Sequence, residues 1–485
     1  MTPLLRRGLG EVSLWGLAVL LCAALLVVAR DEVVYIALGV ITALVIAVIV
    51  ALGPEKAGTS FVVLGTFAAP MSALVVPGAT FVTATDLLYA IGFVLLLPTI
   101  LGRHVGVPAG FSFFAMACLF IGVIASLAAP DVMGSLNFQL RFVAGVLIVP
   151  LVFLAWRPSL PVVQVLAGAY VVGTAVSFLG GIARGDRPGG RFIGFTEHPN
   201  VLGLTGLFAT GLCVFLISQT RRSLAWVWLG AGAMGLGVVW FSGSRAALVV
   251  AAVIALLFPV VERSAKAAGW LLGSITVALV AASQIRLGGD SALDRLTGGG
   301  SASYSDAERE QLFHRYWQGF LDQPLLGHGF EESVLGHNVY LQMAYSMGVF
   351  GAMAFIGLIA VGALQLLVAP KPWNRLAYPL LSYALIAPLT SVVWDRYIWV
   401  PAALAFVVAA DVARVRAGLP GDLIPPDTVV EPDGPRVAAR PHPVAFVRGA
   451  WTGPTRIGAL AAAAAPAGGK RRADVPVDAP SRTDD

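Results

Sequence analysis

Long apolar runs of membrane-spanning length recur through most of this 485-residue chain, separated by short polar or glycine- and proline-containing segments. A helix needs about 20 apolar residues to cross the core of a bilayer. Backbone polar groups in lipid must be satisfied within the spanning element, which favours helices. The chain is 58% hydrophobic and only 12% charged, whereas ordinary soluble domains carry about a quarter charged residues. The sequence therefore predicts an all-α polytopic membrane protein.

Fourteen runs are candidates for membrane spans: residues 12–29, 33–52, 60–76, 84–101, 111–129, 138–156, 161–182, 201–218, 224–241, 246–261, 267–285, 339–368, 376–393 and 397–410. The first follows Arg6 and Arg7 and is long enough to span, so we interpret it as a retained signal anchor and not a cleaved signal peptide. The short runs 246–261 and 397–410 could instead be re-entrant or strongly packed helices. We therefore expect 12–14 transmembrane helices.

One long polar segment, residues 286–340, interrupts the apolar series. Within it, residues 305–322 have an amphipathic pattern that opens with Ser305 and Glu308 in capping-box spacing, which predicts a helix. The segment continues through Gln-Pro-Leu-Leu-Gly-His-Gly-Phe and ends at His337 and Asn338, where the next apolar run begins. We expect residues 286–338 to form one large loop over an active site.

The arrangement of the basic residues favours cytoplasmic N- and C-termini. A raw count of Lys and Arg hardly decides between the two orientations, at 13 inside against 11 outside. However, every Lys of the membrane portion then lies inside, and most of the outer Arg lie in the two longer polar connections, where the positive-inside rule is weakest. The large loop is then extracytoplasmic, and the protein is expected in the cytoplasmic (inner) membrane with its active site facing outside.

The C-terminal part differs in composition. From residue 417 onward the chain is rich in Pro, Ala, Asp and Arg. We expect a transmembrane domain over residues 1–416 and a disordered cytoplasmic tail over residues 417–485.

Several function classes find no support in the sequence. The three cysteines, Cys22, Cys118 and Cys213, lie inside apolar runs, which indicates neither a metal cluster nor a disulfide framework. The chain contains no HExxH, CxxC or P-loop motif. The pair Asp290 and Asp294 is a weak metal site, and we expect no metal. The formal charge of +5 comes without a basic stripe interleaved with aromatics, so a nucleic acid is not an expected partner.

Three arginines are expected at the outer ends of apolar runs: Arg141, Arg191 and Arg245. An arginine beside a membrane segment is costly and usually faces a partner or a polar cavity. Its rigid fork of donors suits phosphate oxygens, so several arginines in one pocket would suit a diphosphate. Each of them taken alone could simply snorkel to lipid headgroups.

His337 is the leading candidate for acid–base chemistry, because a neutral imidazole can take a proton from a sugar hydroxyl or orient it. A boundary histidine can equally be a hydrogen-bonded structural residue, and His198 and His328 are rivals on the same side. Arg309, on the amphipathic run, could reach the same pocket or face water.

Together, several phrases of this sequence resemble the O-antigen ligase and O-antigen polymerase family. They are Arg191-Phe-Ile-Gly-Phe, Pro199-Asn200-Val-Leu-Gly, Ser244-Arg245, Arg309, Pro324-Leu-Leu-Gly-His-Gly329, His337-Asn338-x-Tyr340 and Gly348. The resemblance covers about residues 191–351, and the order and spacing of the phrases make it specific. It departs from the usual family pattern at Glu197-His198, where either residue could contact the acceptor.

The resemblance implies a glycosyltransferase-C-like membrane enzyme without cofactor or metal. Such an enzyme passes a glycan from an undecaprenyl-diphosphate carrier to an acceptor hydroxyl, with inversion. It implies that Arg191 and Arg245 hold the diphosphate, that His337 activates or positions the acceptor, and that Arg309 matches an arginine at the start of the loop helix. Asn200, Asn338 and His198 are expected to bind substrate, while Arg141 rests on the physical argument alone.

A transporter or flippase for a lipid-linked oligosaccharide is the alternative. It would require polar groups near the middle of several spans, whereas here the middles are apolar and the polar residues gather at one side. The residues do not separate ligase from polymerase. They also do not distinguish a glycan, a lipid or a protein acceptor.

Overall fold

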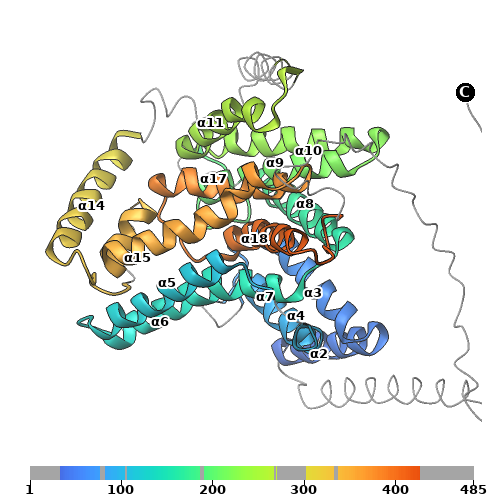
Figure 1. Ribbon diagram of the computed structural model, residues 1–485, viewed down its shortest axis with the longest axis horizontal. Helices are drawn as coiled ribbons and strands as arrows, with labels where there is room; N and C mark the ends of the chain where they lie inside the picture. Colours follow the sequence, from blue (N-terminus) through green and yellow to red (C-terminus); the bar gives the residue numbers. More distant parts are fainter. Residues whose placement is uncertain are drawn as a thin grey trace, which may run out of the picture. The chain divides into compact units, whose positions relative to one another are not determined.

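The computed structural model describes residues 33–76, 82–103, 106–185, 190–266, 269, 302–331 and 337–425. The runs 12–29 and 267–285 and the tail beyond residue 425 lie outside these ranges. Within them the regular elements are helices, apart from one β-bridge between Val75 and Thr83 (Figure 1). The prediction of an all-α polytopic protein is confirmed, since nine described helices are long and apolar enough to cross a membrane.

The helices follow the chain in this order: α2 (Val33–Leu52), α3 (Pro54–Ala68), α4 (Ala84–Leu101), α5 (Ala109–Leu127), α6 (Val132–Phe142), η1 (Val143–Ile148), α7 (Val149–Trp156), α8 (Leu160–Arg184), α9 (Pro199–Gln219), α10 (Arg222–Phe241), α11 (Arg245–Glu262), α14 (Ala302–Asp322), α15 (Val339–Ala363), α16 (Gln365–Val368), η3 (Trp373–Ala377), α17 (Tyr378–Ile386), η4 (Ala387–Leu389) and α18 (Arg396–Arg416). The element η1 is a single π-helical turn that joins α6 to α7 in one long span.

Helix α18 lies at the centre of the described bundle. It packs against α7, α9, α15 and α17 (Figure 1), and almost all of its side chains are buried. Trp399 and Phe406 are fully buried along it. Residues 397–410 are therefore part of a strongly packed helix, which was one of the two interpretations of that short run.

Two predicted spans are wrong in extent. The run 60–76 is helical only as far as Ala68, because the chain then turns and the Ala73 amide donates to the carbonyl oxygen of Phe195 at 3.0 Å. The run 376–393 contains only the nine-residue helix α17 flanked by 3-10 turns. Beyond it the chain folds back, and the Tyr383 hydroxyl donates to the carbonyl oxygen of Val392 at 2.9 Å.

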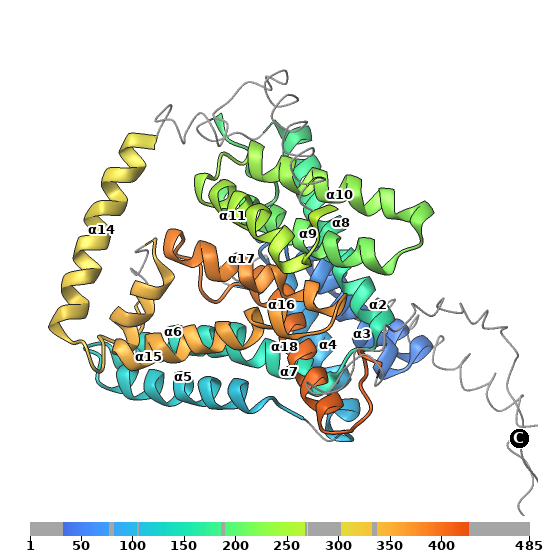
Figure 2. The ribbon, with the colours of Figure 1, turned by 45° about the horizontal axis from the view of Figure 1, so that its top comes forward.

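The run 339–368 is not one straight helix. Gly348 has φ 67 and ψ −174, which breaks α15 after about two and a half turns. Helices α5, α6 and α15 lie side by side in Figure 2, and the side of α15 that faces them carries the fully buried Phe355. The kink itself is also buried, since Gly348 and the fully buried Met347 before it belong to the packed side of α15.

The bundle has a site end and an ion-pair end. We define the site end by segments 72–76, 82–86, 191–198, 242–245 and 394–397, which hydrogen bonds and a shared cavity join to one another. At the ion-pair end, Glu262 bonds Arg375 through both carboxylate oxygens at 2.8 and 2.9 Å. Basic residues of several elements gather there: Lys56, Arg103, Arg157, Lys371, Arg375 and Arg414.

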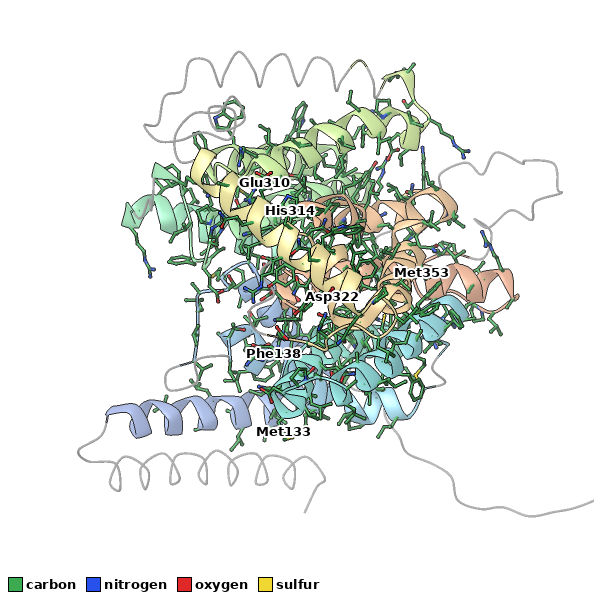
Figure 3. All side chains as sticks on the ribbon, turned by 90° about the vertical axis from the view of Figure 1, so that its left-hand side faces the viewer. Met133, Phe138, Glu310, His314, Asp322 and Met353 are labelled. Carbon is green, nitrogen blue, oxygen red and sulfur yellow. The ribbon has the colours of Figure 1, made fainter. Side chains whose placement is uncertain are left out.

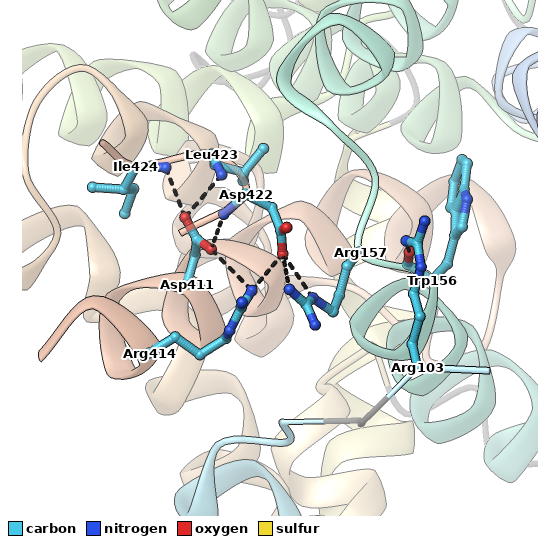
Figure 4. Close-up of polar contacts among 8 residues, drawn as sticks. All are labelled: Arg103, Trp156, Arg157, Asp411, Arg414, Asp422, Leu423 and Ile424. Carbon is cyan, nitrogen blue, oxygen red and sulfur yellow. Dashed lines mark hydrogen bonds and ion pairs between the residues drawn. The ribbon is translucent and has the colours of Figure 1, made fainter. Parts of the chain in front are cut away.

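Residues 417–425 fold back onto α18 at the ion-pair end, although the sequence analysis placed them in a disordered tail. The carboxylate of Asp411 accepts from the amides of Asp422, Leu423 and Ile424 at 2.7–2.9 Å (Figure 4). Asp422 in turn pairs with Arg157 and Arg414. These nine residues therefore belong with the helical unit.

Candidate functional site

Arg191 joins three elements at the site end. Its Nε donates to the carbonyl oxygen of Ser242 at 2.9 Å, and its Nη2 donates to Oδ1 of Asn200 at 2.7 Å. Only 8% of Arg191 is exposed. The predicted pair Arg191 and Asn200 is thus in direct contact, and the two bonds fix the plane of the guanidinium.

Arg245 is the first residue of α11, three positions after the Ser242 carbonyl that Arg191 binds. Ser244 caps this helix, since its side chain accepts from the Ala247 amide at 3.4 Å. The turn is pressed against the start of α9, because a Cβ at Gly203 would lie 2.7 Å from both Ser242 Oγ and Ser244 Cβ. The fold therefore places both predicted diphosphate arginines around one turn, next to a helix N-terminus that favours anions.

His198 has a structural role. As the N-cap of α9, its Nδ1 accepts from the Asn200 amide at 3.1 Å. The loop before it is held by Thr196, whose hydroxyl donates to the carbonyl oxygens of Ile193 and His198. His198 thus supports the position of Asn200, whatever further contact its ring makes.

The segment Pro324–Gly329 fills the kink of α15. The His328 and Gly329 amides donate to the carbonyl oxygens of Tyr345 and Ser346 at 2.8 and 3.0 Å, and the Val349 amide donates to Pro324 O at 2.8 Å. Carbonyls that lost their helical partners at Gly348 are therefore satisfied by the loop. The Pro-Leu-Leu-Gly-His-Gly phrase is a structural clamp at the base of the loop.

His328 belongs to this clamp. Its Nε2 is 2.8 Å from the Gly319 carbonyl oxygen, and its ring stacks on Tyr345 at 4.7 Å. Both contacts fix it between α14 and α15, so His328 is not a good rival to His337.

His337 lies two residues before α15 and has a left-handed backbone with φ 49. Non-glycine residues adopt this conformation at a cost, and such positions cluster at functional sites. Asn338 is the N-cap of α15, with its Oδ1 accepting from the Leu341 amide at 3.1 Å. The cap fixes where the helix begins and hence where His337 stands. Asn338 is therefore a positioning residue in this structure, not a demonstrated substrate contact.

Helix α14 confirms the predicted loop helix, although it begins at Ala302 and so extends past the proposed cap at Ser305. Figure 3 looks onto it, with Glu310, His314 and Asp322 along its length. Tyr316 is buried against Tyr345 of α15 with their rings perpendicular at 5.0 Å. Arg309 is half-buried on this helix.

A cavity of about 370 Å³ opens at the site end. Its charged lining consists of Asp86, Arg141, Glu197, Asp395 and Arg396. Arg396 pairs with Oδ1 of Asp86, while Oδ2 of Asp86 accepts from the Thr83 amide and hydroxyl at 2.9 and 2.8 Å. The structure therefore puts Arg141 in a polar cavity, as the physical argument required.

Two carboxyls of this cavity, those of Asp395 and Glu197, have a raised pKa. Burial raises the pKa of Asp395 from 3.8 to about 6, and the nearby Glu197 and Asp86 add to the rise while Arg396 opposes it. Burial also raises the pKa of Glu197, although its side chain is exposed to the cavity.

A comparison with curated proteins found no match to the chain. Residues 230–356 match the family model of the O-antigen ligases. The resemblance is confirmed over this stretch, which begins within α10 and ends at Ile356 of α15, beyond the kink at Gly348.

The O-antigen ligase match includes Arg245, Arg309, His337 and Asn338. The other expected site residues, Arg141, Arg191, His198 and Asn200, lie outside it but at the same end of the bundle. Of these eight residues, only Arg141 lines the cavity. The candidate site thus has two parts: the Arg191–Arg245 turn and the polar cavity.

The sequence analysis missed Asp86, Asp395 and Arg396 as residues of the candidate site. A signal was present, because Asp395-Arg396 is a charged pair between two apolar runs. Among the described residues, no group of three or more His, Cys, Asp and Glu is placed to hold a metal ion. Asp290 and Asp294 lie outside the described residues.

Proposed function

We propose that the protein is a membrane glycosyltransferase that moves a glycan from an undecaprenyl-diphosphate carrier to an acceptor hydroxyl at the extracytoplasmic face. The O-antigen ligase match supports the class of enzyme. The observation that carries the proposal is that Arg191, bonded to Asn200, also bonds the Ser242 carbonyl oxygen, three residues before Arg245.

In the proposed reaction, the acceptor oxygen attacks the anomeric carbon opposite the bond to the carrier. The carbon–oxygen bond to the diphosphate breaks, and the carrier leaves as undecaprenyl diphosphate with inversion at the sugar. The diphosphate is a good leaving group, so the protein must mainly supply positive charge that is already in position. Arg191 and Arg245 supply that charge, and the N-terminus of α11 adds to it.

His337 takes the proton that the acceptor hydroxyl loses. An imidazole is suited to this because its ordinary pKa is near neutrality. The Asn338 cap and the left-handed backbone fix the base of this side chain. Arg309 on α14 would contribute further positive charge.

The proposed orientation puts the site end outside the cytoplasmic membrane. Basic residues are enriched on the cytoplasmic side of membrane proteins. Lys371 pairs with Glu262 at the ion-pair end. Lys56 lies at the same end, because it follows Glu55, which pairs with Arg103 there. That end is therefore assigned to the cytoplasm.

The test is a transfer assay with purified protein, an undecaprenyl-diphosphate oligosaccharide and candidate acceptors, with and without a chelator. Transfer that resists the chelator and is lost in Arg245→Ala and His337→Ala would support the proposal, and product length would separate ligase from polymerase. Retained transfer in both variants would contradict it. Tight donor binding without turnover would support a flippase instead.

A further inference from the structure

We propose that the 370 Å³ cavity lined by Arg141, Glu197 and Asp395 is a carbohydrate subsite, which binds one or two sugar residues next to the diphosphate arginines. The inference deepens the proposed function and rests on it. It concerns residues that lie apart from the Arg191–Arg245 turn.

The cavity has the size and chemistry of a sugar site. Small-ligand pockets span about 300–1000 Å³, so this cavity is at the small end of the range. Its lining combines carboxylates and guanidinium groups with the aromatic residues Trp394 and Tyr397. Carboxylates accept hydrogen bonds from sugar hydroxyls and guanidinium groups donate to them. A polyprenyl chain would cover the Glu197 carboxylate without offering it a hydrogen bond, which is costly.

Glu197 is the group best placed to receive a hydroxyl. Both carboxylate oxygens of Asp86 already have partners, one in Arg396 and the other in Thr83, so Asp86 is a fixed part of the cavity wall. Among the described residues, no donor bonds the Glu197 carboxylate. The Glu197 amide is anchored, since it donates to Ser72 Oγ at 3.4 Å.

One short loop connects the subsite to the diphosphate arginines. Arg191 is bonded to Ser242 and Asn200 at the start of this loop, and Glu197 projects into the cavity six residues later. The middle of the loop is fixed by the Phe195 amide, which donates to Ser177 Oγ at 3.0 Å. A sugar bound through Glu197 would therefore be held in fixed relation to the diphosphate.

The far wall is shaped by the π-helical turn. It begins two residues after Arg141, and Gly145 within it approaches the Trp394 carbonyl so closely that a Cβ would clash with the carbonyl oxygen. π-helical turns occur frequently at functional sites. Arg141 itself lies 4.9 Å above the Phe138 ring, which packs against Trp394 at 6.1 Å. These contacts fix Arg141 and Trp394 in the same wall.

The charge of the subsite predicts its selectivity. Three carboxyls and two guanidinium groups line it, so it is negative by one charge when all are ionised. We therefore expect it to favour neutral or cationic sugars over uronic acids. The sugar could belong to the acceptor or to the donor glycan, because both present the same hydroxyls.

The first experiment measures binding of N-acetylglucosamine, glucosamine and glucuronic acid to the full-length protein by saturation-transfer NMR. The variant is Glu197→Gln, and Glu55→Gln at the ion-pair end is the matched control. A hydrogen bond to a charged group is stronger than one to a neutral amide, so we expect roughly tenfold weaker binding in Glu197→Gln and none of this loss in the control. Equal binding by all three proteins, or no sugar binding at all, would overturn the proposal.

The second experiment determines the source of the sugar from steady-state transfer. A rise in KM for the acceptor alone in Glu197→Gln assigns the subsite to the acceptor, and a rise for the donor alone assigns it to the donor glycan. Sugar binding that depends on Glu197 in a protein without transfer activity would refute the glycosyltransferase and leave the subsite. Transfer with unchanged KM values and unchanged sugar binding would refute the subsite and leave the enzyme.

Discussion

The Nε of Arg191 donates to the carbonyl oxygen of Ser242 at 2.9 Å, across 51 residues of sequence. This bond joins the loop before α9 to the turn that starts α11, and a second bond to Asn200 completes the junction. The Arg191 side chain therefore both carries a positive charge and holds the turn in its shape.

Arg191→Lys tests whether geometry or charge matters at this junction. Lysine keeps the charge but is a point donor that cannot reproduce both bonds in one plane. We expect transfer to fall about tenfold or more, because each bond to a charged group contributes about 1.5–3 kcal/mol. The measurement is kcat/KM for the donor, compared among the wild type, Arg191→Lys and Asn200→Ala. Full activity in Arg191→Lys would show that charge alone suffices.

At position 337, two substitutions separate the effect of losing the imidazole from the effect of the left-handed backbone. Asn tolerates the left-handed conformation found there, whereas Ala does so at a cost of about 1–2 kcal/mol. We expect both His337→Asn and His337→Ala to lose about 100-fold or more in kcat, while only the Ala variant also loses thermal stability. Substantial transfer by His337→Asn would rule out His337 as the base.

Gly348→Ala should destabilise the protein. Gly348 has a positive φ, and its Cβ would clash with the Leu325 carbonyl oxygen. We expect a loss of more than about 1 kcal/mol and a lower midpoint of thermal unfolding in detergent. Gly237→Ala on α10 is the matched control, since a Cβ there meets nothing within 4 Å. An unchanged midpoint for Gly348→Ala would contradict the clamp described above.

Asp395 should make stability depend on pH. Its folded pKa is about 6, against an ordinary value of 3.8, so between these values the folded state binds more protons than the unfolded state. Stability contributed by this group is therefore present below about pH 4 and is lost as the pH rises to about 6. We expect the difference in unfolding midpoint between the wild type and Asp395→Asn to change over this window. A constant difference from pH 4 to 7 would refute the raised pKa.

Asp411→Asn should loosen residues 417–425. The carboxylate receives three backbone amides through two oxygens, and an asparagine has only one oxygen to offer them. We expect faster hydrogen exchange at Asp422, Leu423 and Ile424 with the rest of the bundle unchanged. Exchange as slow as in the wild type would show that the buried Leu423 and Ile424 side chains suffice to hold the segment.

The sequence predicted helices well where hydrophobic length alone determines them. The run 84–101 coincides with α4, and the runs at 201–218 and 224–241 differ from α9 and α10 by a few terminal residues. It failed at residues 376–393, because apolar composition does not show where Tyr383 and Val392 fold the chain back. The kink at Gly348 was not predicted either, since a single glycine in an apolar run is compatible with a straight helix.

The candidate site was predicted only in part. Arg191, Asn200 and Arg245 carry sequence signals, and the structure groups them. The cavity as a whole was not predicted, because Asp86, Arg141 and Asp395 come from three distant segments that only the packing of the helices brings together. His198 and His328 were rivals to His337 in the sequence, and the structure gives the ring of each a hydrogen bond to the backbone.

The clamp at the kink of α15 has a mechanical consequence. Helix α14 packs on Leu341 and Tyr345, which lie between His337 and Gly348, and the Pro324–Gly329 segment bonds the same turns. The first turns of α15 are thus held from two sides, because Val339 and Met343 are also fully buried in the main core. The backbone position of His337 at the start of these turns therefore depends on the packing of α14 as well as on the core.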